Sequence, residues 1–468
     1  MARRVCRAVL PGAGFAVAYA LAILLGRATR VEGSEVSLVW PAAAVAVLWG
    51  LHAHDLPRVQ AALHWTGLAV LTFAINLATD APVGLSAWFV LVNVSLAAVT
   101  TIVLRYGDRP ARLREPADLG RLVGAIVAGT LVSATLAVAW FAHEGQDDLV
   151  RTFALFAIRN GVTALTGVAV ALRLGEAQWR RHRPSPARMA ETAALLVVTS
   201  IVFIRVFWLN PGHPNAFGVM LPAMWVSLRY ATTTSTVFLA ASGVSIVWAT
   251  LLGRGALSEV DPPQQALLAQ GLVGTLTIVV LSLALFRDSR NELIEELRQL
   301  ALHDPLTGLA NRSLLMTRLE RELDEQQPGA VGVIVLDLDG FKAVNDAWGH
   351  SEGDLLLVEM ATRLRAAVRR RDTVVRLGGD EFVVLCPGLA HHDELHQCAE
   401  RIREAVARPY GVAADAPFDR ITASVGTAVS DRLSTPRSLL AAADRAMYEA
   451  KRAGRNRTAA APYALRAG

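Results

Sequence analysis

The sequence predicts an α-helical polytopic membrane domain followed by an α+β domain with a ferredoxin-like sheet. Three observations lead to this fold class. The chain has 468 residues, which suggests two or three domains. Nearly all long apolar runs precede about residue 287, and from residue 304 short β-branched runs alternate with amphipathic segments. We therefore expect a membrane domain at 1–287, a linker at 288–303, a second domain at 304–457 and a tail at 458–468.

The first part of the chain consists of apolar segments long enough to cross a bilayer as helices, about 20 residues each. The mean hydropathy of the whole chain is +0.37, and only 19% of its residues are charged. About ten spans are expected, of which the eighth and ninth have the weakest signal. They lie near residues 8–26, 36–52, 61–79, 83–104, 120–142, 152–172, 190–209, 215–229, 231–252 and 265–286.

Basic residues in the loops predict the orientation of these spans, because cytoplasmic loops are enriched in Lys and Arg. If the spans alternate, three arginine clusters share one side, and an even number of spans returns the C-terminal domain to the cytoplasm. Membrane topology therefore accounts for most of the net charge of +5, and no nucleic-acid polymer is expected as a partner. The basic start followed by an apolar stretch predicts a signal anchor. The clusters are Arg3, Arg4 and Arg7; Arg105, Arg109, Arg112 and Arg114; and Arg173, Arg180, Arg181, Arg183 and Arg188.

A few polar residues interrupt the apolar spans, where polar groups are costly. One interpretation is that they satisfy one another across helices, and the other is a ligand pocket between helices. His52 and His54 are close enough in sequence to bind a metal ion, but two histidines without further ligands favour an interfacial position. The polar residues are Asn76, Asn93, Arg159, Asn160 and Arg205.

A Trp-Pro segment, Val39-Trp40-Pro41-Ala42-Ala43-Ala44, begins the second span and is followed by Trp49-Gly50-Leu51. It resembles the early helix of the MASE-type sensor domains found ahead of bacterial signalling enzymes. The resemblance covers residues 1–287 and implies a sensor in the bacterial inner membrane. It does not indicate the ligand.

The linker after Arg287 becomes abruptly charged. Leu293, Leu297 and Leu300 recur at helical spacing and form a narrow apolar seam. Such a seam suits either a parallel two-stranded coil or a single amphipathic helix resting on its own domain.

The second domain is expected to contain four strands and four helices in an order compatible with a ferredoxin-like antiparallel sheet. The expected strands are 331–337, 373–377, 382–386 and 421–429, and the expected helices are 312–325, 353–370, 393–407 and 436–453. Cys386 and Cys398 show no metal-binding or disulfide spacing.

Acidic residues follow two of these strands. Asp337 and Asp339 lie at the end of the first, and Gly378-Gly379 forms a tight turn ahead of Asp380 and Glu381. A carboxylate cluster at this point suits Mg²⁺, which proteins hold with a few carboxylates and substrate phosphates. Phosphoryl or nucleotidyl transfer is the function that this predicts, although a solvated acidic turn has the same pattern.

Residues 304–457 resemble the GGDEF family of diguanylate cyclases through four motifs in order. The motifs are Asp304-Pro305-Leu306-Thr307-Gly308-Leu309-Ala310-Asn311-Arg312; Asp337-Leu338-Asp339-Gly340-Phe341-Lys342-Ala343-Val344-Asn345-Asp346, with Gly349-His350 and Gly353-Asp354; Arg376-Leu377-Gly378-Gly379-Asp380-Glu381-Phe382; and Ala443-Asp444-Arg445-Ala446-Met447-Tyr448, with Lys451 and Gly454-Arg455-Asn456.

This resemblance implies a nucleotide-cyclase or polymerase-palm-like domain that binds one GTP. Two such domains in a homodimer condense two GTP into cyclic di-GMP and two pyrophosphates, with Mg²⁺ or Mn²⁺. The implied metal ligands are Asp337, the Leu338 carbonyl and Asp380; Asp380 or Glu381 acts as the base; Asn345 and Asp354 bind guanine; and Gly378, Gly379, Lys342, Lys451, Arg455 and the amides near Phe341 contact phosphates.

An Arg-x-x-Asp segment, Arg369 to Asp372, precedes the signature strand at the spacing of the family's product-inhibition site. Arg401 resembles the second arginine of that site. Three adjacent arginines are also typical of a solvated helix end.

Two other functions are compatible with parts of the sequence. One is a silent domain that binds GTP or cyclic di-GMP without catalysis, although the signature is intact. The other is a transporter with a nucleotide-regulated tail, although no inverted repeat is evident. Only 11 residues follow Arg457, so no phosphodiesterase domain is expected in this sequence.

Overall fold

The computed structural model describes residues 2–30, 37–176, 185–209, 215–258, 260–325, 330–409 and 421–462. The chain forms two compact units, Met1–Asn291 and Glu292–Gly468. Arg180, Arg181 and Arg183, which the topology argument used, lie outside the described residues.

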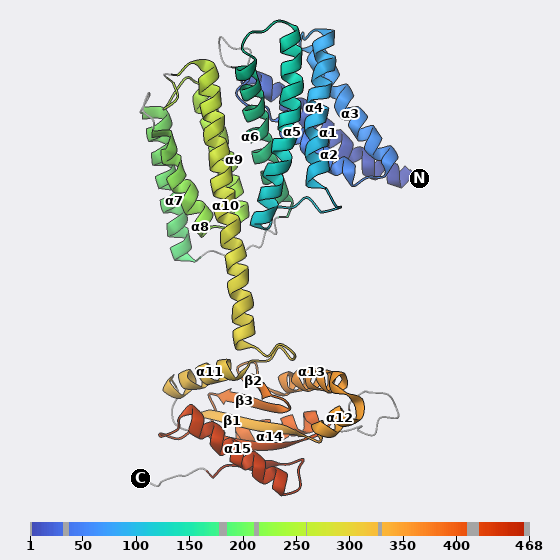
Figure 1. The fold of residues 1–468 in the computed structure, drawn as a ribbon. Helices are drawn as coiled ribbons and strands as arrows, with labels where there is room; N and C mark the ends of the chain where they lie inside the picture. Colours follow the sequence, from blue (N-terminus) through green and yellow to red (C-terminus); the bar gives the residue numbers. More distant parts are fainter. Residues whose placement is uncertain are drawn as a thin grey trace. The chain divides into compact units, whose positions relative to one another are not determined.

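The first unit is a bundle of helices (Figure 1). A helix occurs at each of the ten positions where a span was expected. The helices are α1 (Ala2–Ala28), α2 (Ala42–His54), α3 (Arg58–Ala78), α4 (Val83–Leu104), α5 (Pro116–His143), α6 (Leu149–Gly175), α7 (Pro186–Ile204), α8 (Met220–Arg229), α9 (Thr232–Leu251) and α10 (Pro262–Leu302).

Within the described residues, seven helices are long and apolar enough to cross a membrane, and three further apolar helices are shorter. α2 is one of the short ones. It begins after Pro41 and has 13 residues, which is roughly 20 Å of helix against a hydrocarbon core of about 30 Å. The expected span at 36–52 is therefore too long, because the regular helix starts only at Ala42.

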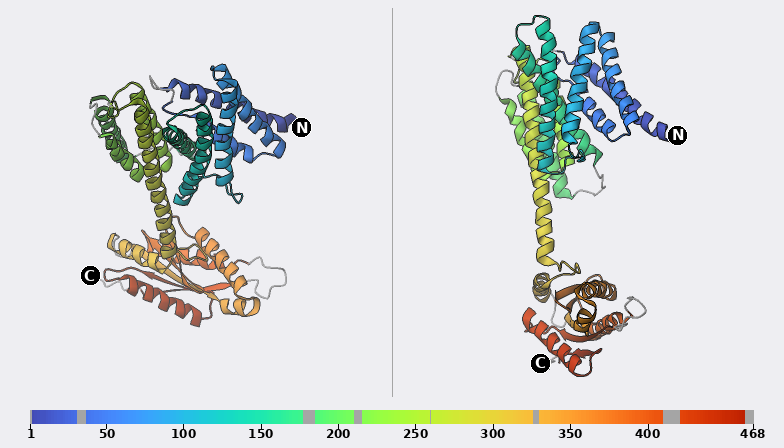
Figure 2. Two further views of the ribbon diagram at one scale, coloured as in Figure 1. Left: turned by 45° about the horizontal axis from the view of Figure 1, so that its top comes forward. Right: turned by 45° about the vertical axis from the view of Figure 1, so that its right-hand side comes forward.

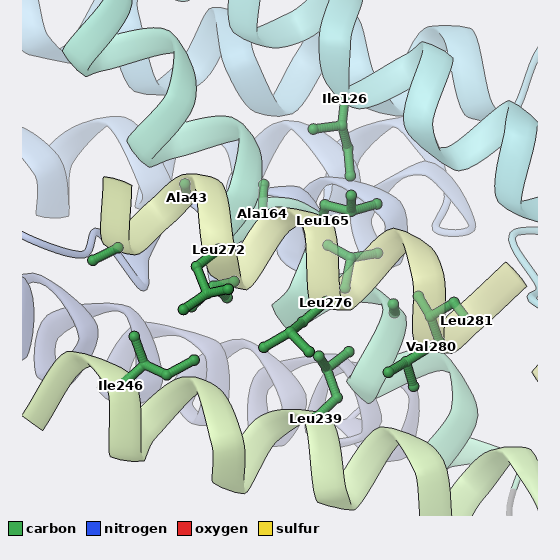
Figure 3. Packing of buried hydrophobic residues seen from close by; sticks show 14 of the residues in the cluster. Ala43, Ile126, Ala164, Leu165, Leu239, Ile246, Leu272, Leu276, Val280 and Leu281 are labelled. Carbon is green, nitrogen blue, oxygen red and sulfur yellow. The ribbon is translucent and has the colours of Figure 1, made fainter. Parts of the chain in front are cut away.

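The core of the first unit joins α2, α5, α6, α9 and α10 through aliphatic side chains. Figure 3 shows Leu276 and Val280 of α10 next to Leu239 of α9, and Leu165 of α6 on the opposite side of α10. α10 is therefore a central helix of this unit, and it continues as one helix to Leu302.

The polar residues of the spans differ in their surroundings. The Arg27 guanidinium donates a 3.2 Å hydrogen bond to Asn76 Oδ1 across α1 and α3, as the pairing interpretation predicts. Asn93 Nδ2 donates within its own helix, to the carbonyl of Phe89. His52 packs 5.2 Å from the ring of His64, which the sequence analysis did not single out.

The linker prediction is confirmed as helix but not as a separate segment, since α10 has no break at residue 288. Leu293, Leu297 and Leu300 are 54%, 55% and 62% exposed. An amphipathic helix resting on its own domain would bury this seam, so the structure contradicts that alternative.

The second unit contains a five-stranded sheet with helices on both faces (Figure 2). The strand order β2-β3-β1-β4 is antiparallel throughout, as expected for a ferredoxin-like sheet, and β5 adds a parallel strand beside β4. The elements are α11 (Arg312–Glu325), β1 (Val331–Asp339), α12 (Phe341–Trp348), α13 (His350–Ala367), β2 (Thr373–Gly378), β3 (Glu381–Pro387), α14 (His392–Val406), β4 (Thr422–Val429), α15 (Pro436–Arg452) and β5 (Thr458–Ala460).

The alternation of side chains along β1 explains the two layers of helices. Ile334 and Leu336 pack with α12, α13 and α14 on one face. Val333 and Val335 pack with α11 and α15 on the other. Both faces of the sheet are apolar and covered by helices. We therefore look for the functional site at the polar ends of the strands.

Candidate active site

The acidic ends of β1 and β3 lie next to each other. Asp337 is the register partner of Glu381, and the amide of Leu338 donates a 3.3 Å hydrogen bond to the carbonyl of Asp380. Gly379 has φ +53° in the turn between β2 and β3, where a side chain would be strained. The turn thus brings Asp380 to the end of β1, as the sequence predicted.

Burial and mutual repulsion act on these carboxyl groups. Burial raises the pKa of Asp337, the nearby charges of Asp380 and Asp339 raise it further, and Lys451 opposes the rise. Burial also raises the pKa of Glu381, with added contributions from Asp337 and Asp444. Such a cluster favours binding of a cation.

Lys451 at the end of α15 supplies a cation in this structure. Its Nζ lies 2.8 Å from Asp337 Oδ2. The resemblance implied a contact with phosphate, and the structure instead pairs Lys451 with the carboxylate. The Lys451 ammonium therefore supplies the positive charge beside the Asp337 carboxylate in this structure.

Asp339 holds the turn that follows α15. Its carboxylate accepts hydrogen bonds from Thr422 Oγ1 and Ser424 Oγ at 2.8 Å each, and from the amide of Asn456 at 3.1 Å. The Arg455 Nε lies 3.9 Å from the same carboxylate, and Arg455 and Asn456 both have positive φ. Asp339 thus positions Arg455, a role that the sequence analysis did not assign to it.

The two residues expected to bind guanine lie on neighbouring helices, Asn345 on α12 and Asp354 on α13. A Cβ on Gly353 would lie 1.9 Å from Asn345 Oδ1, so only glycine permits this close approach. α12 begins after Gly340, whose φ is +85°, and Phe341 and Lys342 form its first turn. Unpaired amides at a helix start favour an anion.

The Arg-x-x-Asp segment forms a tight turn between α13 and β2. The amide of Arg369 donates to Asp372 Oδ2 at 2.9 Å, and Arg401 Nε donates to the carbonyl of Ala367 at 3.3 Å. The three expected residues therefore gather at the same end of α13. A cavity of about 280 Å³ opens beside them, lined by Arg369, Asp372 and three further arginines, Arg318, Arg365 and Arg370.

Glu394 was missed by the sequence analysis. Its Oε2 lies 2.8 Å from Arg369 Nη1, and this hydrogen bond holds the pKa of Glu394 below its ordinary value. Glu394 is 25 residues from Arg369, so no local sequence pattern links them. The arginine expected to bind product is thus engaged by a carboxylate of the chain itself.

Cys386 and Cys398 come together with Asp372, with ligand atoms within 4.8 Å of one another. Both thiols are buried in the apolar layer between α14, which carries Cys398, and β3, which carries Cys386. Hydrogen bonding to Cys398 and burial raise the pKa of the Cys386 thiol. They pack as small apolar side chains, and their separation of 12 residues hid this contact.

Asp304 stabilises the turn at Gly378 and Gly379 through Arg376. Its Oδ1 lies 3.0 Å from Arg376 Nη1, and Arg376 Nε donates to the carbonyl of Gly379 at 2.9 Å. Burial disfavours ionisation of Asp304, but hydrogen bonds from Thr307 and Arg376 outweigh it and hold the pKa below its ordinary value. The ion pair therefore contributes stability while Asp304 is ionised.

We expect Asp304→Asn to destabilise the second unit by about 2 kcal/mol at pH 7, because charged hydrogen bonds to Thr307 and Arg376 are lost. The carboxylate's pKa is depressed on folding, so its contribution is present above about pH 4 and is lost as pH falls through the folded value. Thermal unfolding at pH 7 and pH 3 measures this. An equal difference at both pH values would contradict the assignment, and the exposed Asp324→Asn is the control.

Comparison with known proteins agrees with this arrangement. Residues 12–291 match the family model described as MASE1, and residues 301–457 match the model described as "Diguanylate cyclase, GGDEF domain". The chain is 36% identical over 296 residues to the bifunctional diguanylate cyclase/cyclic di-GMP phosphodiesterase MucR of Pseudomonas aeruginosa, which covers 56% of this chain and 43% of MucR.

Two further similarities concern the second unit. The response regulator PleD of Caulobacter vibrioides is 41% identical over 171 residues, covering 36% of this chain and 37% of PleD. The coiled coil and GGDEF domain of DgcB from Caulobacter crescentus, solved in complex with c-di-GMP, has 32% identity and a TM-score of 0.35. It covers 37% of this chain and 93% of that structure.

The chain spans less than half the length of the curated relatives MucR and PleD. The MASE1 match extends over more than half of the chain, and the GGDEF match follows it directly. Several apolar helices in the first unit are long enough to span a membrane. The chain therefore belongs to the multi-pass membrane proteins that join an N-terminal MASE1 sensor domain to a C-terminal GGDEF domain of the diguanylate cyclase family.

Proposed function

We propose that the chain is a diguanylate cyclase that condenses two GTP molecules into cyclic di-GMP and two pyrophosphates. The observation that carries this proposal is the carboxylate cluster at the ends of β1 and β3, with Lys451 Nζ 2.8 Å from Asp337. Two residues after β1, α12 begins at Phe341, and the amides of a helix start favour phosphate. Both features serve nucleotidyl transfer.

A divalent ion, Mg²⁺ or Mn²⁺, fits the residues present. Asp337, the Leu338 carbonyl and Asp380 offer the hard oxygen ligands that such ions prefer, and Asp337 already attracts the Lys451 ammonium. A bound divalent ion would lower the pKa of an attacking hydroxyl and neutralise charge on the phosphates. Asp380 or Glu381 accepts the proton from the ribose 3′-hydroxyl in this proposal.

The remaining residues bind and orient GTP. The Asn345 amide donates to or accepts from the guanine edge. The Asp354 carboxylate accepts from guanine N–H groups, which excludes adenine. Lys342, Lys451 and Arg455 meet the β- and γ-phosphates, together with the amides of Phe341 and Lys342 and the turn at Gly378 and Gly379. On GTP binding Lys451 then exchanges Asp337 for a phosphate.

One site of this kind holds one GTP, so bond formation requires a second domain that presents its GTP to the first. We propose a homodimer whose exposed seam, Leu293, Leu297 and Leu300, forms a parallel coil. The linker 288–303 would then connect the MASE1 domain in the bacterial inner membrane with a catalytic domain that begins at residue 304 in the cytoplasm. The expected tail at 458–468 is wrong at its start, because Thr458–Ala460 forms β5 of the sheet. In this proposal the MASE1 domain regulates the two catalytic domains of the homodimer.

We expect the full chain, purified into lipid nanodiscs, to convert GTP with Mg²⁺ into cyclic di-GMP and pyrophosphate in a ratio of one to two. Mass spectrometry of the nucleotide and a pyrophosphate assay measure the two products. ATP is expected to give no cyclic dinucleotide, because adenine lacks the guanine N–H groups from which the Asp354 carboxylate accepts hydrogen bonds. Saturable GTP binding without cyclic di-GMP would identify a silent binding domain and contradict the proposal.

Gly353→Ala is expected to raise KM for GTP about tenfold, because the added Cβ would lie 1.9 Å from Asn345 Oδ1 and must displace that side chain. The value of kcat should change less, since the carboxylates at Asp337 and Asp380 are untouched. Steady-state kinetics separates the two constants. Ser351→Ala, exposed on the same helix, is the control. A fall in kcat at constant KM would contradict a role for this contact in guanine binding.

A further inference from the structure

Arg159 lies in the interior of α6, ten residues from the start of a membrane-spanning helix. Within the described part of the chain no carboxylate pairs with it. Its Nε donates a 3.2 Å hydrogen bond to Asn160 Oδ1, and its Cζ lies 5.2 Å from the ring of Trp40 and 4.7 Å from that of Phe156. An intramembrane cation held by an amide and two rings is costly without an anion.

Other polar groups surround Arg159. A small niche brings it together with Ser37 and with Gln270 of α10, both of which are buried. Gln270 Nε2 donates a 2.6 Å hydrogen bond to the carbonyl of Leu38, immediately before the Trp-Pro segment. The Trp-Pro segment and Arg159, which the sequence singled out separately, therefore belong to one polar site.

An apolar cavity of about 270 Å³ lies between the same two helices, α6 and α10, with α5 on its third side. Ile158 lines both the niche and the cavity. Further along, Gly274 of α10 approaches α6 so closely that a Cβ there would lie 2.8 Å from Val162. Figure 3 shows Leu165 and Ile126, which line the cavity from α6 and α5.

The size of the cavity restricts its occupant. The cavity of about 270 Å³ suits one acyl chain of medium length and not the two long chains of a phospholipid. Its lining is apolar apart from Thr130. At the other end a single planar guanidinium matches one carboxylate in charge and in hydrogen-bonding geometry.

We propose that the niche and the cavity between α6 and α10 form a binding site for a medium-chain fatty acid, with the carboxylate at Arg159 and the chain in the cavity. α10 forms one wall of the site and continues as a single helix to Leu302. Occupancy therefore changes the packing of the helix that leads to the catalytic domain. This regulatory consequence rests on the proposed cyclase function, whereas the binding itself does not.

The binding experiment uses the full chain in phosphatidylcholine nanodiscs, radiolabelled decanoate as the probe and no GTP. We expect saturable binding of one decanoate per chain and a loss of affinity of at least about tenfold in Arg159→Gln. Decanol, which has the chain without the charge, should bind as weakly as decanoate binds to Arg159→Gln. Decyl phosphate separates a carboxylate site from a phosphate site and should bind more weakly than decanoate.

Two further variants guard against misfolding. Arg254→Gln removes another arginine that stacks on a tryptophan, 4.8 Å from Trp208, and should leave decanoate binding unchanged. Ile278→Phe fills the cavity from a residue that is 45% exposed, and should weaken binding while Arg159 is intact. Equal decanoate affinity in the unaltered chain and Arg159→Gln, or equal affinity for decanol and decanoate, would overturn the proposed site.

The regulatory consequence is measured separately, as the initial rate of cyclic di-GMP formation with and without decanoate. A change of about fivefold is expected in the unaltered chain and in Arg254→Gln, and none in Arg159→Gln. Decanoate binding with an unchanged rate would overturn the regulatory step alone. If no variant makes cyclic di-GMP, the proposed function fails and the binding result still stands.

Discussion

Asp380→Ala is expected to lower the rate of cyclic di-GMP formation by at least about a thousandfold. Asp380 lies on the turn beside Asp337, and its carbonyl accepts the amide hydrogen of Leu338. Alanine keeps that backbone bond and removes only the carboxylate. The variant should therefore fold normally and lose a metal ligand, so the chemical step fails while the turn persists.

Single-turnover kinetics with GTP and Mg²⁺ measures this loss, and Mn²⁺ binding followed by electron paramagnetic resonance identifies its cause. We expect weaker Mn²⁺ binding in Asp380→Ala and unchanged Mn²⁺ binding in Glu381→Gln, which would assign Glu381 to proton transfer. Glu449→Ala removes an exposed acid from α15, two residues before Lys451, and should retain full activity. Undiminished product from Asp380→Ala would rule out the assigned mechanism.

The catalytic sheet was predictable because its strands are short apolar runs that end in acidic or glycine residues. The acidic and glycine residues mark where β1 ends and where β3 begins. The sequence therefore predicted that Asp337 and Glu381 lie next to each other, and the strand register confirms it. The four antiparallel strands appear in the expected order. Local sequence pattern and tertiary structure agree here because each strand is buried on both faces.

Elements with weak local signals were missed. α12 has only eight residues between Gly340 and Gly349, too few for a helical period to be recognised. β5 has three residues and forms by pairing with β4. The continuity of α10 was also missed, because the abrupt change from apolar to charged composition after Arg287 suggested a boundary where no Gly or Pro breaks the helix.

Contacts between distant residues were not predictable either. Glu394 engages Arg369 across 25 residues, and Asp339 reaches Asn456 across 117. Each depends on how helices pack on the sheet, which a single sequence does not encode in any spacing. The first of these contacts changes the expectation for the inhibition site, because Glu394 competes with any bound anion.

We expect Arg369→Ala to weaken cyclic di-GMP binding about tenfold to a hundredfold, because a guanidinium that hydrogen-bonds phosphate or guanine contributes about 1.5–3 kcal/mol. The initial rate should stay the same while the product plateau rises. Glu394→Gln should act in the opposite direction. It keeps the size of the side chain but removes the charge that holds Arg369 at 2.8 Å, so inhibition should set in at lower product concentration.

Isothermal titration with cyclic di-GMP and progress curves of pyrophosphate release measure both effects. Disruption of the fold around α13 and α14 would weaken product binding in both variants, so opposite changes at one ion pair identify Arg369 as a binding residue. Arg437→Ala, which removes an arginine from the first turn of α15, serves as the control for loss of positive charge. Identical product sensitivity in the unaltered chain and Arg369→Ala would reject the site, because Arg369, Asp372 and Arg401 would then form only a solvated helix end.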